Sequence, residues 1–432
     1  MSAVKLADIF TDHMVLQRRK PIAVFGDGCG KGRVELCGNA VEFEATDGWL
    51  IHLPPMEAGG PYTLTATLNG DTVTLTDVLV GDVYLAGGQS NMQFRVEESV
   101  DIPRIPNERV RVFTEGHFAD ENRNAWHDYS PWRVATAENL ESFTAIGYDV
   151  GRMLQEELNV PIGIVSCNIG ASRVDAWTAP ERVETEDYQQ MLGAKHNDWH
   201  YYKFNQGSWC YLNKLLPVVP YTIRGVLWYQ GESNRLEEEA VHYHTLLEIL
   251  IENWRDLWQA DLPFYIVQIA PHADGEWNDW PHIRQAQERV SKEVANTYLC
   301  TLGHTGEADN IHPTKKHHLA EKLTNAVLAN EFGYDAEYCG PVYDTIERTA
   351  EGVKITFTHA DGLHFDGDPA DIAVYDRDDN PIPCAVAVEG TALVFTADGI
   401  ARVEMGWRNA PTHNLYNGCG YLASPFQIIL GE

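Results

Sequence analysis

The chain lacks the long apolar segments that mark membrane-spanning and exported proteins. No window holds about 18 consecutive apolar residues, the minimum that suggests a bilayer span. The opening sequence, MSAVKLAD, is not a charged segment followed by an apolar stretch. From the residues alone we therefore expect no membrane partner and a cytoplasmic location.

Paired cysteine motifs are also absent. The eight cysteines are scattered along the chain and form no Cys-x-x-Cys pair. This spacing favours free thiols in a reducing compartment over a disulfide framework.

Positive charge is scarce. The chain has 32 Lys and Arg against 63 Asp and Glu, which gives a formal net charge of −31. The resulting negative field repels polyphosphates, so we expect no nucleic-acid partner. An anionic substrate would need local basic groups to offset the same field.

What the chain does have is enough apolar sequence for a sizeable core. Apolar residues make up 44% of the 432 residues, a length that predicts two or three domains. Residues 1–76 predict an N-terminal β-sandwich, residues 77–333 an α/β domain in which strands alternate with helices, and residues 334–432 a C-terminal β domain. The short strands expected in the two β segments are 22–25, 33–36, 62–68 and 72–75, and then 352–358, 372–375, 392–396 and 401–405.

The most informative motif is Gly-Gln-Ser-Asn-Met at residues 88–92. It follows residues 83–86, a short apolar run that is typical of a buried strand. Glycine permits a sharp turn, and a helix that begins at Ser90 would aim free N–H groups at developing negative charge. Ser90 is therefore a candidate nucleophile, and the alternative is an ordinary helix cap.

A candidate partner lies far downstream, in Asp-Asn-Ile-His-Pro at residues 309–313. In a serine hydrolase an imidazole takes the serine proton, and a carboxylate orients that imidazole. Asp309 and His312 have the residue types for these two tasks. The alternative is that Asp309 caps a turn and His312 lies on the surface.

Two further strands are expected to end at the same cleft. Residues 222–229 run into Gln-Gly-Glu-Ser-Asn at 230–234, and residues 160–168 run into Ile-Gly-Ala-Ser at 169–172. Ligand clefts of open α/β sheets form at the carboxyl ends of strands. These two segments therefore join Ser90 as candidates for the site.

Together the motifs resemble those of the sialate O-acetylesterase family, which belongs to the SGNH hydrolases. The matching segments are GQSNM at 88–92, Gly170 before Ala176-Trp177, WYQGESN at 228–234, Asp309-x-x-His312, FTDHMVLQR at 10–18 and DVLVGDVY at 77–84. The likeness extends over nearly the whole chain. It implies an SGNH-type three-layer α/β/α catalytic domain, flanked here by the N-terminal and C-terminal β domains.

The resemblance also implies roles for single residues. Ser90 would be the nucleophile, His312 the general base and Asp309 the acid behind it. The backbone N–H groups of Ser90 and Gly170 would form an oxyanion hole with a side-chain donor from the third motif. We assign that donor to Gln230.

Two of these roles have rivals in the third motif. Asn234 is the alternative oxyanion donor. Glu232 is a candidate second acid, which either orients His312 in place of Asp309 or organises the loop as a buried carboxylate.

The implied activity is removal of O-acetyl groups from sialic acids, which are small-molecule substrates with a carboxylate. Arg173 is the first candidate to bind that carboxylate, ahead of Arg95 and Arg235. The alternative is that these arginines pair with nearby acids such as Asp175. Two alternative functions remain for the protein. One is an esterase for acetyl-xylan or another acetylated carbohydrate, and the other is a non-catalytic carbohydrate-binding protein on an esterase scaffold.

No metal or cofactor is expected. The pairs His242-x-His244 and His317-His318 lack the spacing and companion ligands of a zinc site. The aromatic segment HNDWHYY at 196–202 is a candidate wall for a sugar ring.

Overall fold

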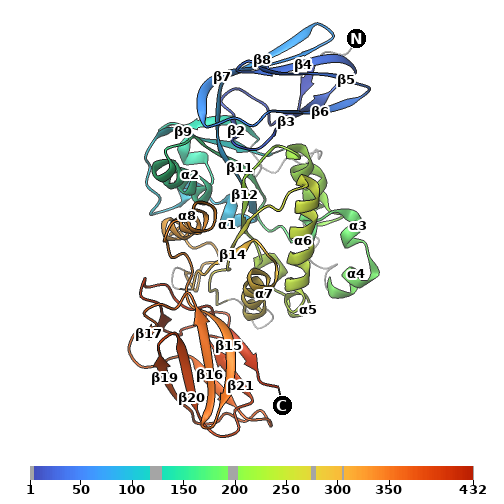
Figure 1. Ribbon diagram of the computed structural model, residues 1–432. Coiled ribbons are helices and arrows are strands. Elements are labelled where there is room, and N and C mark those ends of the chain that lie inside the picture. The colour runs from blue at the N-terminus through green and yellow to red at the C-terminus, as the bar shows by residue number, and fades with distance from the viewer. Residues whose placement is uncertain (1–3, 117–128, 193–202, 274–278, 304–305, 432) are drawn as a thin grey trace.

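The computed structural model describes residues 4–116, 129–192, 203–273, 279–303 and 306–431. The molecule is elongated, with an N-terminal β unit at one end, an α/β unit in the middle and a C-terminal β unit at the other end (Figure 1). In the part of the chain that the structure describes, no helix is long and apolar enough to cross a bilayer.

A mixed sheet forms the middle of the molecule. Its strands are, in spatial order, β10 (Ser130–Ala135), β9 (Asn107–Thr114), β11 (Ile162–Asn168), β8 (Asp71–Gly88), β12 (Gly225–Tyr229), β13 (Phe264–Val267) and β14 (Thr297–Cys300). All pairs are parallel except β10 with β9. Every residue of β11, β12 and β13 is buried, as expected for parallel strands with helices on both faces.

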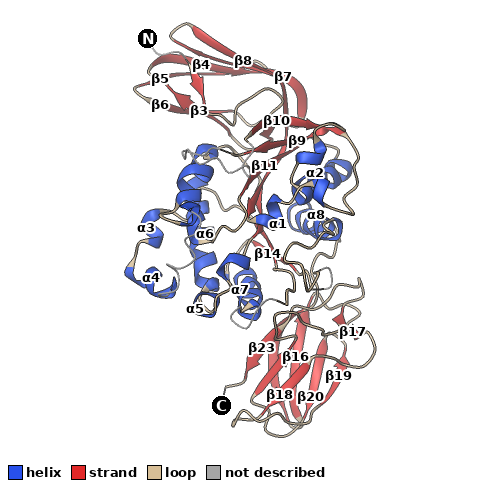
Figure 2. Ribbon diagram, turned by 180° about the vertical axis from the view of Figure 1, so that it is seen from behind, coloured by secondary structure: helices blue, strands red, loops and turns tan. Residues whose placement is uncertain are grey.

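Helices cover the two faces of this sheet in pairs. On one side lie α2 (Ala145–Leu158) and α8 (His317–Phe332), and on the other lie α6 (Tyr243–Trp258) and α7 (Trp280–Glu293) (Figures 1 and 2). The short helices α3 (Pro180–Val183), α4 (Glu186–Leu192) and α5 (Glu237–Ala240) lie on the α6 side. The expectation of an α/β unit with a large sheet is confirmed.

Strand order reverses at β8. The chain passes from β8 to β9 and β11 on one side of it, and then continues with β12, β13 and β14 on the other. The parallel register places Gly88 beside Asn168 of β11 and beside Tyr229 of β12. Open α/β sheets form their ligand cleft at such a reversal, at the carboxyl ends of the strands.

β8 is shared with the N-terminal β unit. Its first half pairs with β7 (Gly59–Leu68), whereas its second half is completely buried in the central sheet. Where the two halves of β8 meet, the backbone of Asp77 has a φ of 53° and the pairing of β8 with β7 shifts register. The expected domain boundary between residues 76 and 77 therefore falls inside one strand, and N-terminal and central residues share one hydrophobic core. The other N-terminal strands are β1 (Lys5–Leu6), β2 (Val15–Gln17), β3 (Ile22–Asp27), β4 (Gly30–Leu36), β5 (Asn39–Ala45) and β6 (Gly48–Leu53).

The C-terminal β unit has a core of its own. It begins after α8, which ends at Gly333 with a φ of 72°. Arg284 of α7 donates to the carbonyl of Asn409 at 3.1 Å and so ties this unit to the central one. Its strands are β15 (Val342–Thr349), β16 (Gly352–Thr358), β17 (His364–Phe365), β18 (Ile372–Tyr375), β19 (Ala385–Glu389), β20 (Ala392–Thr396), β21 (Arg402–Met405), β22 (Leu415–Tyr416) and β23 (Phe426–Ile429).

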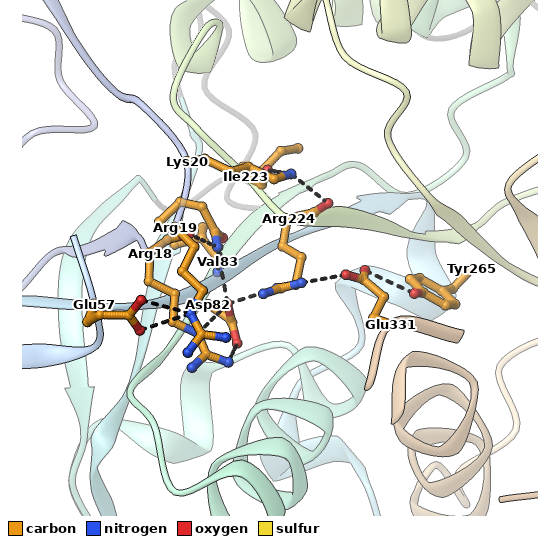
Figure 3. A network of polar contacts seen from close by, with 11 residues as sticks. Arg18, Arg19, Lys20, Glu57, Asp82, Val83, Ile223, Arg224, Tyr265 and Glu331 are labelled. Atoms are coloured by element: carbon orange, nitrogen blue, oxygen red, sulfur yellow. Dashed lines mark hydrogen bonds and ion pairs between the residues drawn. The ribbon is translucent and has the colours of Figure 1, made fainter. Parts of the chain in front are cut away.

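A buried ion network joins the N-terminal segment to β8, β12 and α8 (Figure 3). The carboxylate of Asp82 accepts from Arg18 Nη2 at 2.7 Å and from Arg224 Nε at 2.8 Å. Arg224 Nη1 also donates to Glu331 Oε2 at 2.6 Å. Burial alone would raise the pKa of Asp82, but the hydrogen bonds and charges of the two arginines outweigh burial and hold that pKa below its usual range.

We expect Asp82→Asn to lower the free energy of unfolding by about 3–5 kcal/mol, because it leaves two buried guanidinium groups without their shared counter-charge. Urea denaturation at pH 7 measures this loss. The control is Asp27→Asn, since the Asp27 side chain is 72% exposed in its ion pair with Lys5 and should contribute under about 1 kcal/mol.

The contribution of Asp82 should also depend on pH. The Asp82 carboxylate stabilises the fold above the ordinary Asp pKa of about 4 and loses this effect as pH falls below that value, so the difference in free energy of unfolding between wild type and Asp82→Asn should shrink on acidification. Equal losses for the two variants would contradict this account of the network.

Candidate active site

Ser90 stands at the carboxyl edge of the sheet because β8 ends in glycine. Gly88 has a φ of 131°, and a Cβ at this position would lie 2.1 Å from the carbonyl oxygen of Tyr229. Only glycine permits this approach of β8 to β12. The chain then turns through Gln89, and Ser90 begins the short helix α1 (Ser90–Gln93).

The structure brings Ser90 and His312 together. Ser90 Oγ lies 2.8 Å from His312 Nε2, which is hydrogen-bonding distance for a nucleophile and its base. The loop that carries His312 is organised by the carboxylate of Glu307, which accepts from Thr314 N–H at 2.8 Å and from Asn310 Nδ2 at 2.9 Å. Asn310 Oδ1 in turn accepts from the backbone N–H of His312 at 3.0 Å.

Two effects favour the neutral, basic form of the His312 imidazole. Burial, followed by the positive charge of Lys316, lowers the pKa of His312 below its ordinary value. Burial also lowers the pKa of Lys316 to about 7. A lowered pKa keeps His312 able to accept the serine proton at pH values below neutrality.

We expect Lys316→Met to raise the pKa of His312, because the variant removes a nearby positive charge. The acid limb of the pH profile of kcat/KM should then move to higher pH, and a stopped assay of ester hydrolysis between pH 5 and 8 measures the shift. Lys322→Met is the matched control, since Lys322 is a buried lysine of α8, the helix that begins just after Lys316, and its ammonium group donates to the carbonyl of Thr301 at 2.6 Å. If the acid limb of the profile stayed in place for Lys316→Met, or moved equally for both variants, the charge of Lys316 would not be a cause of the lowered pKa of His312.

Asp309 does not take the position expected for the third member of a triad. Its side chain is exposed, and in the structure it makes no hydrogen bond with His312, both residues being among those described. The carboxylate that contacts the backbone of this loop belongs instead to Glu307, which accepts from the N–H of Thr314. The role of Asp309 remains a prediction.

Among the described residues Glu232 makes no hydrogen bond with His312 either. It is buried, and its Oε1 accepts from Asn91 Nδ2 at 2.6 Å. Burial raises the pKa of Glu232. Of the two roles considered for this residue, the geometry matches the buried carboxylate that organises the loop.

Two of the expected oxyanion donors are backbone N–H groups. As the first residue of α1, Ser90 keeps its N–H outside the hydrogen-bond ladder of the helix. The N–H of Gly170, by contrast, donates to Gln93 Oε1 at 2.7 Å. Gly170 thus lies beside Ser90 as expected, but its donor is engaged by a side chain one helical turn after the nucleophile.

The side-chain donor assigned to Gln230 is also engaged. Gln230 Nε2 donates to Asn234 Oδ1 at 2.8 Å, and the backbone carbonyl oxygen of Ser172 and the side-chain Oε1 of Gln89 lie at 3.1 and 3.2 Å, so its two N–H groups are used inside the protein. Asn234 shows the opposite pattern. Its Oδ1 accepts from Val174 N–H at 3.1 Å as well, whereas its Nδ2 is fully buried and has no hydrogen-bond partner among the described residues. We therefore move the prediction from Gln230 to its rival, Asn234.

Arg173 is not at the substrate surface. Its side chain is 1% exposed, its Nε donates to Asp175 Oδ1 at 3.1 Å, and its Nη1 lies 2.7 Å from Glu239 Oε2. The alternative in which Arg173 pairs with neighbouring acids is the one observed. Arg95 donates to Glu97 at 3.3 Å, and Arg235 donates to the carbonyl of Glu232 at 2.9 Å.

Three of these four histidines, His244, His317 and His318, lie in helices and contact carboxylates, whereas His242 lies just before α6. His317 Nδ1 is 2.5 Å from Asp149 Oδ2, and His244 Nε2 is 2.8 Å from Glu293 Oε2. No group of three or more metal-ligating side chains occurs within the described ranges. The aromatic segment 196–202 lies outside the described residues.

The model of one protein family matches more than half of the chain. This family is described as carbohydrate esterase, sialic acid-specific acetylesterase, and its model matches residues 80–329. The match begins before the Ser90 motif and ends inside α8, after the His312 loop.

Known proteins of similar sequence and structure point the same way. The sialate O-acetylesterase of Pongo abelii is 25% identical, with 82% of this chain and 76% of that protein covered. The sialate O-acetylesterase of Mus musculus is 26% identical, with 82% and 79% covered. A crystal structure of a novel carbohydrate acetylesterase from Xanthomonas citri is 27% identical with a TM-score of 0.87, and covers 99% of this chain and 100% of its own.

Proposed function

Since the chain belongs to the family of sialic acid-specific acetylesterases, which are carbohydrate esterases, we propose that it removes O-acetyl groups from sialic acids through an acetyl-serine intermediate on Ser90. The observation that carries the proposal is the distance of 2.8 Å between Ser90 Oγ and His312 Nε2. An SGNH-type arrangement of the α/β unit belongs to the same proposal. The turn after β8 supports it by presenting the nucleophile at the reversal of strand order.

The reaction follows from this geometry in two steps. Ser90 Oγ attacks the acetyl carbonyl carbon while its proton passes to His312 Nε2, and the carbonyl oxygen becomes an oxyanion that accepts from the N–H of Ser90 and from Asn234 Nδ2. The C–O bond to the sugar breaks, and the proton on His312 passes to the leaving sugar oxygen. Water then gives a proton to His312 and attacks the acetyl-serine, which releases acetate and restores Ser90.

The charge around one cavity supports an anionic sugar as substrate. A cavity of about 340 Å³ borders α1 at Gln93, and among the described residues it is lined by the bases Arg95, Arg133 and Lys214 and by the acid Glu115. In a chain with a net charge of −31, a cavity wall that carries these guanidinium and ammonium groups favours a carboxylate-bearing ligand. Arg133 takes the place of Arg173 as the proposed carboxylate-binding residue.

A second candidate substrate is a neutral acetylated carbohydrate such as acetyl-xylan. The observation in its favour is the burial of Arg173 in ion pairs with Asp175 and Glu239, which removes the basic group expected next to the second motif. The high structural similarity to a carbohydrate acetylesterase is compatible with either substrate.

Acetate release from O-acetylated sialic acids and from acetylated xylo-oligosaccharides distinguishes the two. We expect a higher kcat/KM for the sialic acids, and a loss of about tenfold or more on them alone in Arg133→Gln, because a charge-assisted contact contributes about 1.5–3 kcal/mol. Arg109→Gln is the control. Arg109 lies near the start of β9, at the end of the strands opposite the site, and donates to Asn159. This variant should leave kcat/KM for both substrates unchanged. A preference for xylo-oligosaccharides with no specific effect of Arg133→Gln would support the neutral carbohydrate. Lack of any turnover of p-nitrophenyl acetate would favour a non-catalytic carbohydrate-binding protein.

We also propose a cytoplasmic location. All eight cysteines are free, which is compatible with a reducing compartment. Cell fractionation tests this proposal, and recovery of the protein outside the cytosolic fraction would reject it.

A further inference from the structure

Asn91, the residue after the nucleophile, is buried and contacts three separate segments. Its side chain is 1% exposed. Asn91 Nδ2 donates to Glu232 Oε1 at 2.6 Å and to the carbonyl oxygen of Ile311 at 3.0 Å. Asn91 Oδ1 accepts from Lys316 Nζ at 2.6 Å. One amide group thus connects the nucleophile turn to the loop after β12, to the His312 loop and to the residue before α8.

These partners fix the orientation of the amide. The carbonyl oxygen of Ile311 can only accept, so the Nδ2 of Asn91 must face it. Lys316 then meets the Oδ1 of Asn91, while the second N–H reaches Glu232. Because both N–H groups and the oxygen are used, a side chain of the same size without two donors does not reproduce this set of contacts.

The bond to Ile311 closes a ring around the two reacting side chains. Asn91 follows Ser90 directly, and Ile311 precedes His312 directly. The hydrogen bond from Asn91 Nδ2 to the carbonyl oxygen of Ile311 therefore joins the same two segments as the contact of 2.8 Å between Ser90 Oγ and His312 Nε2. Among the described residues His312 makes no hydrogen bond with Asp309, so the bond from Asn91 to Ile311 is a second link, beside the contact of Ser90 with His312, between the nucleophile turn and the loop that carries the base.

We propose that Asn91 is a positioning residue for the esterase reaction, which holds the His312 loop against the Ser90 turn while Glu232 and Lys316 fix its amide. This inference rests on the proposed function, in which Ser90 and His312 carry the reaction. Asn91 acts through the distance between these two groups and contacts no substrate. A displacement of about 1 Å in such a pair can cost on the order of 10²-fold in rate.

Steady-state kinetics of Asn91→Ala and Asn91→Asp with p-nitrophenyl acetate test the proposal. We expect kcat to fall by about 10- to 100-fold in both variants, with KM within about twofold of wild type, and the rate of fluorophosphonate labelling of Ser90 to fall with kcat. Asn91→Asp is the sharper variant because it keeps the size of the side chain but loses the two N–H donors.

The matched control is Asn417→Ala in the C-terminal β unit. Asn417 is also 1% exposed, and its Nδ2 donates to the carbonyls of Cys339 and His359, each at 3.0 Å. This variant should lower Tm and leave kcat unchanged. A fall of kcat in Asn417→Ala as large as that in Asn91→Ala would overturn the proposal, since loss of a buried bridging amide in general would then explain both.

Asp309→Asn provides the second comparison, and it should lower kcat less than Asn91→Ala does. The reverse ranking would overturn the proposal, because Asp309 would then hold the imidazole. Near wild-type kcat in folded Asn91→Ala and Asn91→Asp would overturn it as well. Failure of the proposed function is distinguishable from these results, since it would appear as wild-type protein without turnover or as full turnover in Ser90→Ala.

Discussion

Ser90→Ala is expected to lose esterase turnover by about 10⁴-fold or more, by analogy with nucleophile variants of other serine hydrolases. The variant removes the atom that attacks the acetyl carbonyl and leaves His312 without its proton donor. The fold should be unaffected, since the hydroxyl of Ser90 is hydrogen-bonded only to the ring of His312 among the described residues. Initial rates on p-nitrophenyl acetate and on an O-acetylated sialic acid measure the loss.

Ser291→Ala is the control for this experiment. The hydroxyl of Ser291 donates to the carbonyl of Glu288 at 2.7 Å on α7, away from the nucleophile turn. This variant should keep full turnover. Substantial turnover in folded Ser90→Ala would show that another group is the nucleophile.

Asn234→Ala and Asn234→Asp are expected to lower kcat by about 10²- to 10³-fold, the cost of removing one oxyanion donor. The reason is the buried Nδ2 of Asn234, which has no partner among the described residues, while the Oδ1 of the same group is anchored by Val174 and Gln230. Asn234→Asp keeps an oxygen for the N–H of Val174 and removes only the donors. It should therefore lose kcat at least as strongly as Asn234→Ala.

Asn253→Ala is the matched control for the oxyanion donor. Asn253 is a buried asparagine of α6 whose Oδ1 accepts from Ala179 N–H at 2.9 Å, and its loss should lower Tm without changing kcat. If both Asn234 variants kept wild-type kcat, Asn234 would not be the donor. A large loss in Gln230 variants alone would return the assignment to Gln230.

Much of the fold could be predicted because strand and helix patterns are local. The expected strands at 352–358, 372–375 and 392–396 coincide with β16, β18 and β20. The connection of the N-terminal β unit to the central sheet, at residues 76 and 77 within β8, could not be predicted in the same way. The short strand expected at 72–75 and the apolar run at 83–86 indicate two strands in two environments, yet the structure has one strand that passes through a left-handed residue at Asp77 and serves both.

The site shows the same division between local and distant information. Ser90 and His312 were predicted from their motifs, because a turn after a strand and an imidazole loop before a helix are encoded by neighbouring residues. Arg173 forms an ion pair with Glu239, and the N–H of Gly170 donates to the side chain of Gln93. Neither pairing has a sequence signal of its own. The bond of Asn91 to the carbonyl of Ile311 was missed for the same reason, since any residue type at position 311 offers that carbonyl.

Labelling with a fluorophosphonate followed by peptide mapping tests the central claim most directly. The reagent phosphonylates a serine only where a base activates it, so it reports the pairing of Ser90 with His312 independently of the substrate. We predict a single adduct on the peptide that contains Ser90, which is lost in Ser90→Ala and strongly slowed in His312→Ala. An adduct on another residue, or none in a protein that hydrolyses p-nitrophenyl acetate, would contradict the assignment of Ser90 as the nucleophile.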